Sequence, residues 1–117
     1  MESVGGRIYH LALRREWDAA VVDGSYRRST IDQSLDEVGF IHASFAEQVQ
    51  GTADRFYRGH EDVVLLTIDT AGVRGVIKVE DGFPHIYGPL PVTAVVRVDP
   101  VSVASDGRLM VAPLLAD

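Results

Sequence analysis

The six residues 63–68, Val-Val-Leu-Leu-Thr-Ile, constrain the fold of this 117-residue chain more than any other segment. All but one are aliphatic, and turn-forming residues bound the run, with Gly59 before it and Asp69 to Gly72 after it. A short apolar run between turn signals is typical of a buried strand. The segment therefore predicts the central strand of a sheet, and the rest of the chain must supply its neighbours.

The pattern of apolar residues predicts the other elements of the first half of the chain. Loose alternation indicates a strand over 7–13, and apolar residues at helical spacing indicate a helix over 14–22. A shorter helix is expected over 30–38, because apolar residues recur there at helical spacing and Gly39 follows as a C-terminal stop. A strand over 40–43 should come next.

The clearest helix is expected to begin at Ser44. Ser44-Phe45-Ala46-Glu47 matches the capping-box pattern, in which the Ser hydroxyl and the Glu carboxylate pair with each other's backbone N–H groups. Gly59 should end this helix near Tyr57. Its expected buried stripe consists of Phe45, Val49, Ala53 and Phe56.

Further strands are expected after the central one, at 73–80, 94–98 and 109–111, with a tight turn at Asp81-Gly82. We therefore predict an α+β fold, a single compact domain over residues 1–117 with a mixed, mostly antiparallel sheet and two or three helices. A chain of 117 residues has room for one such core and little more.

Composition excludes several classes of function. The 11 basic against 17 acidic residues give a net charge of −6, which disfavours long nucleic acids, because binding to them depends on neutralising phosphates. The absence of cysteine excludes a disulfide framework, a cysteine nucleophile and a thiolate metal site. No apolar run is long enough to span a membrane and no signal-peptide pattern is visible, so a soluble, cytoplasmic protein is expected.

Three of the four histidines lie in short apolar or aromatic strings. They are His10 in Ile-Tyr-His-Leu, His42 in Phe-Ile-His-Ala-Ser and His85 in Phe-Pro-His-Ile-Tyr, whereas His60 lies in the polar segment Arg-Gly-His-Glu. An imidazole in an apolar strand needs partners for its ring nitrogens, because an unpaired buried polar group costs about 1–3 kcal/mol. Each of the three is therefore either a core histidine with dedicated partners or part of a shared cleft.

Other catalytic patterns are weak or missing. Three imidazoles and a water form a known open zinc arrangement, but no His-x-His or His-Glu-x-x-His spacing occurs, and no metal ligand is assigned. Ser44 lies two residues from His42, yet no Gly-x-Ser-x-Gly elbow surrounds it. The glycines form no phosphate-binding loop.

The histidine strings also carry a family resemblance. IYHLAL, GFIHAS and FPHIYGPLP, in this order and with VVLLTID between the second and third, closely resemble the bacterial and plant family called domain of unknown function 952. The resemblance covers about residues 7–99. It implies a small single-domain α+β protein whose activity has not been settled.

A more distant similarity is to the ADP-ribosyltransferase-like fold. In that fold a His or Arg of the first strand contacts the ribose of NAD, a second motif supplies a Ser or aromatic contact, and a late strand supplies a Glu or another polar group. This similarity implies four catalytic candidates here, His10, His42, Glu80 and His85, and four ligand-binding candidates, Tyr9, Arg14, Ser44 and Tyr87.

The reaction that this similarity implies is cleavage of the bond between nicotinamide and ribose in NAD. Positive charge develops on the sugar, so Glu80 would stabilise it while His10 holds the ribose hydroxyls. The pyrophosphate also needs cations, and the nearest candidates are Arg14, Arg27 and Arg28. The remaining roles, stacking on nicotinamide and orienting the acceptor or a phosphate, fall to Tyr9, Tyr87, His42 and His85.

Three functional hypotheses remain open at this point. The first is a transferase-type enzyme that acts on NAD or another nucleotide-type ligand in a cleft lined by the histidines. The second is a noncatalytic module that binds a small ligand in the same cleft. The third is a histidine-bound metal enzyme. The sequence names no cofactor, with NAD expected only as a substrate, and it leaves the oligomeric state open.

Overall fold

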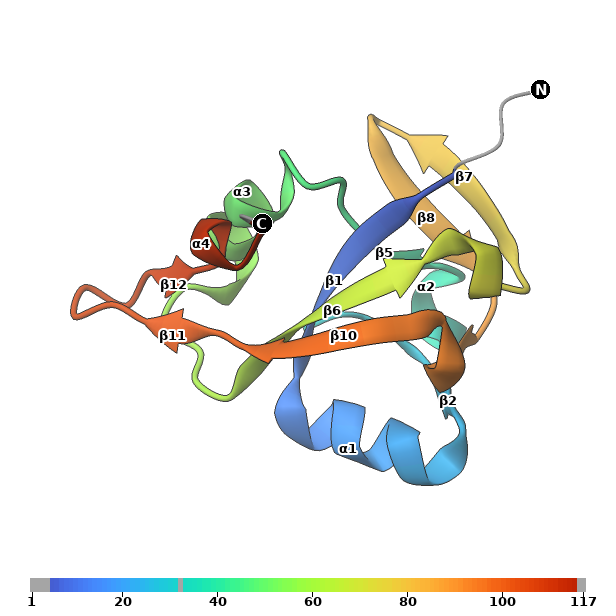
Figure 1. Ribbon diagram of the computed structural model, residues 1–117, viewed down its shortest axis with the longest axis horizontal. Helices are drawn as coiled ribbons and strands as arrows, with labels where there is room; N and C mark the ends of the chain where they lie inside the picture. Colours follow the sequence, from blue (N-terminus) through green and yellow to red (C-terminus); the bar gives the residue numbers. More distant parts are fainter. Residues whose placement is uncertain (1–4, 32, 116–117) are drawn as a thin grey trace.

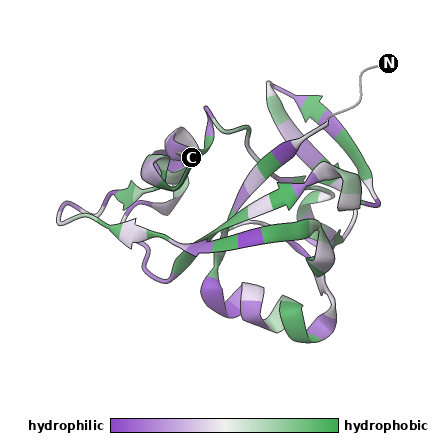
Figure 2. Ribbon diagram, viewed as in Figure 1, coloured by the Kyte–Doolittle hydropathy of each residue, from purple (hydrophilic) through white to green (hydrophobic). Residues whose placement is uncertain are grey.

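The apolar run at 63–68 lies in the central strand of the molecule, β6 (Val63–Asp69). The computed structural model describes residues 5–31 and 33–115. β6 pairs antiparallel with β1 (Arg7–Leu13) on one side and β10 (Val95–Pro100) on the other, and this sheet crosses the middle of Figure 1. Both faces of β6 are buried, which explains why its sequence is almost continuously hydrophobic (Figure 2).

Alternate residues of β6 belong to two separate hydrophobic cores. Val64 and its same-face neighbours pack in the first core, which also contains Trp17 of helix α1 (Arg14–Asp23). Leu65, on the opposite face, packs in the second core, together with Tyr57. Figure 1 shows the corresponding arrangement, with α1 on one side of the sheet and the α3 and β12 region on another.

A second three-stranded antiparallel sheet carries two of the three histidine strings. Its strands, in spatial order, are β5 (Ile41–His42), β8 (Phe83–Tyr87) and β7 (Val76–Glu80). The register places His42 opposite His85, so the pairing of β5 with β8 brings these two histidines together.

Two local features hold this second sheet in place. The hairpin of β7 and β8 turns at Asp81-Gly82, where both residues have positive φ angles, 53° and 83°, as an Asp-Gly turn of type I′ requires. A bridge between Tyr9 and Ser44 joins the end of β5 to β1, because these two residues exchange both of their backbone N–H···O bonds, each 2.8 Å long. The two sheets therefore meet next to the histidines.

The remaining elements are short and surround the two sheets. The predicted α+β fold, with its mostly antiparallel strands in one compact domain, is confirmed. The further helices are α2 (Leu35–Val38), α3 (Val49–Thr52), α4 (Ala112–Leu115), the π-helix η1 (Ala53–Tyr57) and the 3₁₀-helices η2 (Thr70–Gly72) and η3 (Val92–Ala94). The further strand pairs are β2 (Ser25–Tyr26) with β9 (Leu90–Pro91), β3 (Arg28–Thr30) with β4 (Gln33–Ser34), and β11 (Ser102–Val103) with β12 (Leu109–Met110).

The prediction of a helix over 30–38 is wrong for the first half of this range. The strands β3 and β4 occupy that part of the chain, and helix α2 begins only at Leu35. Ser34 caps this helix, since its hydroxyl accepts from the Glu37 N–H at 3.2 Å and the Glu37 carboxylate accepts from the Ser34 N–H at 3.0 Å. The helix ends at Gly39 as expected, with a φ angle of 96° that favours glycine.

The capping box expected at Ser44 and Glu47 does not form. Ser44 is buried in the bridge to β1, and its hydroxyl lies within hydrogen-bond distance, 3.0 Å, of the Thr52 hydroxyl. Residues 46–48 form a turn, and α3 begins at Val49. The bridge holds Ser44 in sheet pairing, so tertiary contacts outweigh the local motif here.

The helical segment formed by α3 and η1 buries a different face from the one predicted. Val49, Ala53 and Tyr57 are buried, while Phe56, expected in the buried stripe, is 44% exposed. The cause is the π-helical turn of η1, because a π-turn takes more residues than an α-turn and rotates the following side chains away from α-helical spacing.

The capping box at Ser34 has a testable effect on stability. Ser34→Ala is expected to lower the free energy of unfolding by about 1 kcal/mol, because it leaves the Glu37 N–H without its partner. Urea unfolding measures the change. Ser102→Ala is a suitable control, since Ser102 is exposed in β11 and should change stability by less than about 0.5 kcal/mol. Equal effects of the two substitutions would contradict the assignment of the cap.

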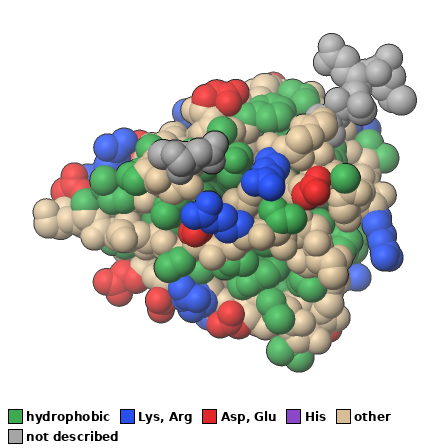
Figure 3. Space-filling model, in the orientation of Figure 1, with side chains coloured by type: hydrophobic (Ala, Val, Ile, Leu, Met, Phe, Trp, Pro, Cys, Tyr) green, Lys and Arg blue, Asp and Glu red, His purple; other side chains and the backbone are tan. Residues whose placement is uncertain are grey.

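The surface carries charges of both signs. On the face shown in Figure 3, acidic and basic side chains are interspersed with hydrophobic ones. This mixture fits the net charge of −6 better than it fits the basic stripe of a nucleic-acid-binding protein. Within residues 5–31 and 33–115, none of the helices is long and apolar enough to cross a membrane.

Candidate functional site

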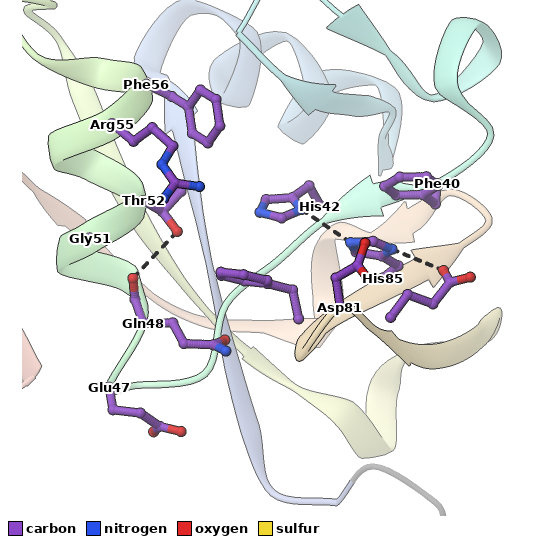
Figure 4. A pocket seen from close by; sticks show the side chains of 12 residues that line it. Phe40, His42, Glu47, Gln48, Gly51, Thr52, Arg55, Phe56, Asp81 and His85 are labelled. Carbon is purple, nitrogen blue, oxygen red and sulfur yellow. Dashed lines mark hydrogen bonds and ion pairs between the residues drawn. The ribbon is translucent and has the colours of Figure 1, made fainter.

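A cleft of about 500 Å³ opens between the second sheet and the segment formed by α3 and η1. We call it the histidine cleft. Figure 4 shows His42 and His85 on the sheet side, with Thr52 and Arg55 on the helix side. Its volume lies in the range of small-ligand sites. The residues that line it are Phe40, His42, Glu47, Gln48, Gly51, Thr52, Arg55, Phe56, Glu80, Asp81, Phe83 and His85.

Hydrogen bonds link Glu80, His85 and His42 into one chain. An ionised carboxylate only accepts hydrogen bonds, so the Nδ1 of His85, which lies 2.9 Å from Glu80 Oε1, carries a proton. The Nε2 of His85 lies 3.2 Å from the Nδ1 of His42. When His85 is neutral, its Nε2 accepts the Nδ1–H of His42. The Nε2 of His42 then has a free lone pair, with no hydrogen-bond partner among the described residues.

The surroundings favour a neutral His42 and an ionised Glu80. Burial, followed by the neighbouring His85, lowers the pKa of His42. The Tyr87 hydroxyl, followed by His85, donates to Glu80 and lowers the pKa of that carboxyl, and the same carboxylate raises the pKa of Tyr87. The Phe40 ring stacks on His85 with a centroid distance of 4.0 Å and an interplanar angle of 11°, which restricts the orientation of the imidazole.

His10 lies outside the lining of this cleft, in the core. It is 3% exposed, and its Nδ1 donates to the carbonyl oxygen of His42 at 2.6 Å. Its Nε2 therefore accepts from the Tyr26 hydroxyl at 2.9 Å. Burial lowers the pKa of His10 to about 4, so the ring is neutral at pH 7. The structure gives His10 dedicated partners, and through its bond to the His42 carbonyl it positions the strand β5.

The ligand-binding candidates are only partly brought together. Tyr9 and Ser44 form the bridge between the sheets, and Arg14 is exposed at the start of α1, so these three residues do not line the histidine cleft. Tyr87 reaches the site through its hydrogen bond to Glu80. Of the eight candidates, His42, Glu80 and His85 line the cleft.

The residues on the helix side of the cleft were not among the predicted site residues. Arg55 is exposed there, makes no ion pair within the described residues, and has its Cζ 5.9 Å from the centroid of the Phe56 ring. Gln48 donates to the Gly82 carbonyl at 2.7 Å and so ties the helix side to the turn between β7 and β8. The sequence signal for this side of the cleft is the adjacent pair Arg55-Phe56. It was missed because α-helical spacing places Phe56 in the core, and the π-turn that exposes this ring cannot be recognised from the sequence.

The three imidazoles do not form a metal site. Both ring nitrogens of His10 are bonded within the protein. Among residues 5–31 and 33–115, no group of three or more His, Cys, Asp or Glu side chains is arranged to hold a metal ion. The hypothesis of a histidine-bound metal enzyme gains no support from this geometry.

Comparison with known proteins identifies the family. Residues 11–98 match the family model described as a protein of unknown function, DUF952. The chain belongs to the DUF952 family. This finding confirms the family resemblance of the three histidine strings.

This DUF952 protein is also similar to a protein of known structure, Protein CC0527 from Caulobacter crescentus. The crystal structure of that protein is 36% identical in sequence and matches with a TM-score of 0.82, over 94% of this chain and 98% of that one. Its solution NMR structure, aligned at 35% identity, matches with a TM-score of 0.67 over 86% and 89% of the two chains. No curated protein matches the chain. None of these names states an activity.

In this DUF952 protein, Gly75, immediately before β7, packs tightly against the backbone of Tyr87 in β8. A Cβ on Gly75 would lie 2.5 Å from the carbonyl oxygen of Tyr87, whose hydroxyl donates to Glu80. Gly75→Ala is expected to lower the free energy of unfolding by about 2 kcal/mol, because the backbones of β7 and β8 must move apart. Urea unfolding measures this loss.

Gly51→Ala is the matched control for this substitution. A Cβ on Gly51 meets no atom within 4 Å, and the residue lies inside helix α3, so alanine should stabilise the protein by about 0.5–1 kcal/mol. A Gly75→Ala variant as stable as the wild type would contradict the tight packing of Gly75 on Tyr87.

Proposed function

We propose that this DUF952 protein is a transferase-type enzyme that binds NAD or a related nucleotide in the histidine cleft and uses His42 as its acid–base residue. The observation that supports this most strongly is the chain Glu80–His85–His42, which ends on a free ring nitrogen in a cleft of ligand size. A cytoplasmic location is part of the proposal, since the cysteine-free composition suits that reducing compartment.

The walls of the cleft suit the parts of a nucleotide. Phe40, Phe56 and Phe83 supply aromatic surface against which flat rings can stack. Arg55 supplies a cation without an acidic partner among the described residues, and guanidinium groups bind phosphate oxygens with paired, charge-assisted hydrogen bonds. In this proposal Arg55 binds the pyrophosphate, in place of the expected candidates Arg14, Arg27 and Arg28, which do not line the cleft.

The histidine chain suits proton transfer during group transfer. In the proposed reaction, the oxygen of a hydroxyl group or water attacks the ribose carbon that carries nicotinamide. The carbon–nitrogen bond breaks, and its electron pair leaves with nicotinamide. His42 takes the proton of the attacking oxygen on Nε2 and passes its Nδ1 proton to His85 Nε2. The positive charge then rests on His85, beside the Glu80 carboxylate, which stabilises it.

In this proposal His10 is a positioning residue. Its Nδ1–H holds the carbonyl of His42, so it sets the place of the His42 backbone without touching the ligand. This differs from the ribose contact expected for a first-strand histidine, because both ring nitrogens of His10 already have partners inside the protein.

Binding of ADP-ribose tests the proposed ligand class. ADP-ribose and NAD are expected to raise the melting temperature of the protein, and Arg55→Gln should weaken ADP-ribose binding by about tenfold, because it removes a charge-assisted bond to phosphate. Calorimetric titration measures the affinity. Adenosine, which lacks phosphates, should bind both proteins equally.

Arg15→Gln is the matched control, since Arg15 is an exposed arginine on α1 that does not line the cleft. It should leave ADP-ribose affinity unchanged. The proposal fails if neither NAD nor ADP-ribose nor a simple nucleotide binds, or if Arg15→Gln weakens binding as much as Arg55→Gln. Binding without turnover by the wild type would instead favour the noncatalytic module.

A further inference from the structure

A second, smaller cavity adjoins the histidine cleft. Its volume is about 210 Å³, and it shares Phe40, His42 and Phe56 with the cleft as lining residues. In Figure 4 the His42 ring lies between Phe56 and Phe40. The strands β3 and β4 and the helix α2 supply the rest of the wall, including Ser29 and Val38. We call this cavity the side pocket.

Ser29, one of the residues that line the side pocket, has a buried hydroxyl without a partner in residues 5–31 and 33–115. Ser29 is 1% exposed, and its Oγ is buried without a hydrogen-bond partner among the described residues. The buried side chains of His10 and Ser44, by contrast, have hydrogen-bond partners. Arg28 Nε and Asp99 Oδ2 are also buried without a hydrogen bond in the part of the chain that the structure describes, but each lies in an ion pair, at 3.0 Å from Glu16 and 2.8 Å from Arg97. Buried hydroxyls are normally paired, because leaving one without a partner destabilises the folded state. Ser29 is therefore an exception that a ligand group in the pocket would explain.

The chemistry of the wall defines what fits. A cavity of about 150 Å³ in another protein holds one benzene ring, so the side pocket has room for a single substituted ring. Phe40, Phe56 and Val38 supply apolar surface for such a ring. No charged side chain is among the described residues that line the pocket, which disfavours an ionised group.

We propose that the side pocket is a specificity subsite for a neutral, planar ring that carries a hydrogen-bonding substituent, with Ser29 Oγ as the partner of that substituent. The inference rests on the proposed function in one respect, that the rest of the same ligand lies in the histidine cleft. His42, which lines both cavities, then lies between the ring and the part of the ligand near Arg55.

Phenol and toluene test this subsite, because they have the same shape and differ in one hydroxyl group. In titrations followed by two-dimensional amide NMR, both should shift the signals of Ser29, Val38 and Phe40, and phenol should bind more tightly. Ser29→Ala should weaken phenol about tenfold and leave toluene unchanged. The melting temperature of the free Ser29→Ala protein should be equal to or higher than that of the wild type, because an unpaired hydroxyl has been removed.

Ser102→Ala, in an exposed strand, is the control and should alter neither affinity. The inference is overturned if phenol does not bind or shifts signals elsewhere. It is also overturned if Ser29→Ala weakens both probes equally, or if it lowers the melting temperature, which would reveal an internal partner for Oγ. These probes need no nucleotide, so the subsite stands if phenol behaves as expected while NAD and ADP-ribose fail to bind, and only the proposed function then fails.

Discussion

Lowering the pH from 7 to 4 is expected to reduce the free energy of unfolding by about 3 kcal/mol through His10. Burial lowers the pKa of His10 in the folded protein to about 4, against 6.5 for an exposed histidine. Between these two values the unfolded chain binds a proton that the folded protein does not bind. The contribution of His10 to stability is therefore complete above pH 6.5 and is lost as the pH falls toward 4.

Protonation of other groups also lowers the stability at acid pH, and their effect must be distinguished from that of His10. The pKa of His42 is also lowered by burial, and the carboxyl of Glu80, held below its ordinary pKa of 4.5, loses its contribution at lower pH still. His10→Asn separates the effect, because its amide can still donate to the His42 carbonyl but does not titrate. This variant should be less stable than the wild type at pH 7, and its stability should depend much less on pH.

Urea unfolding at a series of pH values measures both profiles, and histidine NMR titration reports the ring directly. Ser102→Ala is the control, since Ser102 is exposed in β11 and has no titratable side chain, so the slope of the profile should be unchanged. Parallel profiles for His10→Asn and the wild type, or a His10 ring that takes up a proton near pH 6.5, would falsify the assignment of His10 as a buried neutral residue.

Replacement of His42 is expected to have the largest effect on activity. If the protein releases nicotinamide from NAD as proposed, His42→Asn should lower the turnover rate by about 10²–10⁴-fold, the usual loss when an acid–base residue is removed. ADP-ribose affinity should change by no more than about threefold, because the acid–base role acts on the transition state. The Asn amide can still donate toward His85 Nε2, so the rest of the chain keeps its partner.

Nicotinamide release and calorimetric ADP-ribose binding are the two measurements for this variant. The wild-type rate should fall at acid pH as His42 becomes protonated and loses its free lone pair, with a midpoint below 6.5 because the pKa of His42 is lowered. His60→Asn should retain full activity. A His42→Asn enzyme that is as active as the wild type, or one whose ADP-ribose affinity falls together with its rate, would remove His42 from the acid–base role.

Several parts of the site follow from local sequence and others do not. The Asp81-Gly82 turn was predictable because few residue pairs adopt positive φ at both central positions, and this turn sets the register that joins Glu80 to His85. The failure of the capping box at Ser44 and Glu47 was not predictable, because the four-residue pattern is local. Its outcome depends on the pairing of Ser44 with Tyr9, which lies 35 residues earlier in the chain.

The amino-acid sequence by itself determined the central strand, the α+β class, the family and the importance of the histidine strings, since these depend on residues that are close together in the chain. Only the tertiary structure decided how the histidines divide. Both ring nitrogens of His10 form hydrogen bonds inside the protein, to residues 16 and 32 positions away in the sequence. His42 and His85, 43 positions apart, form a hydrogen bond with each other at the edge of a cleft. Long-range contacts of this kind set burial, and burial decides which imidazole is a core residue and which one keeps a free nitrogen for chemistry.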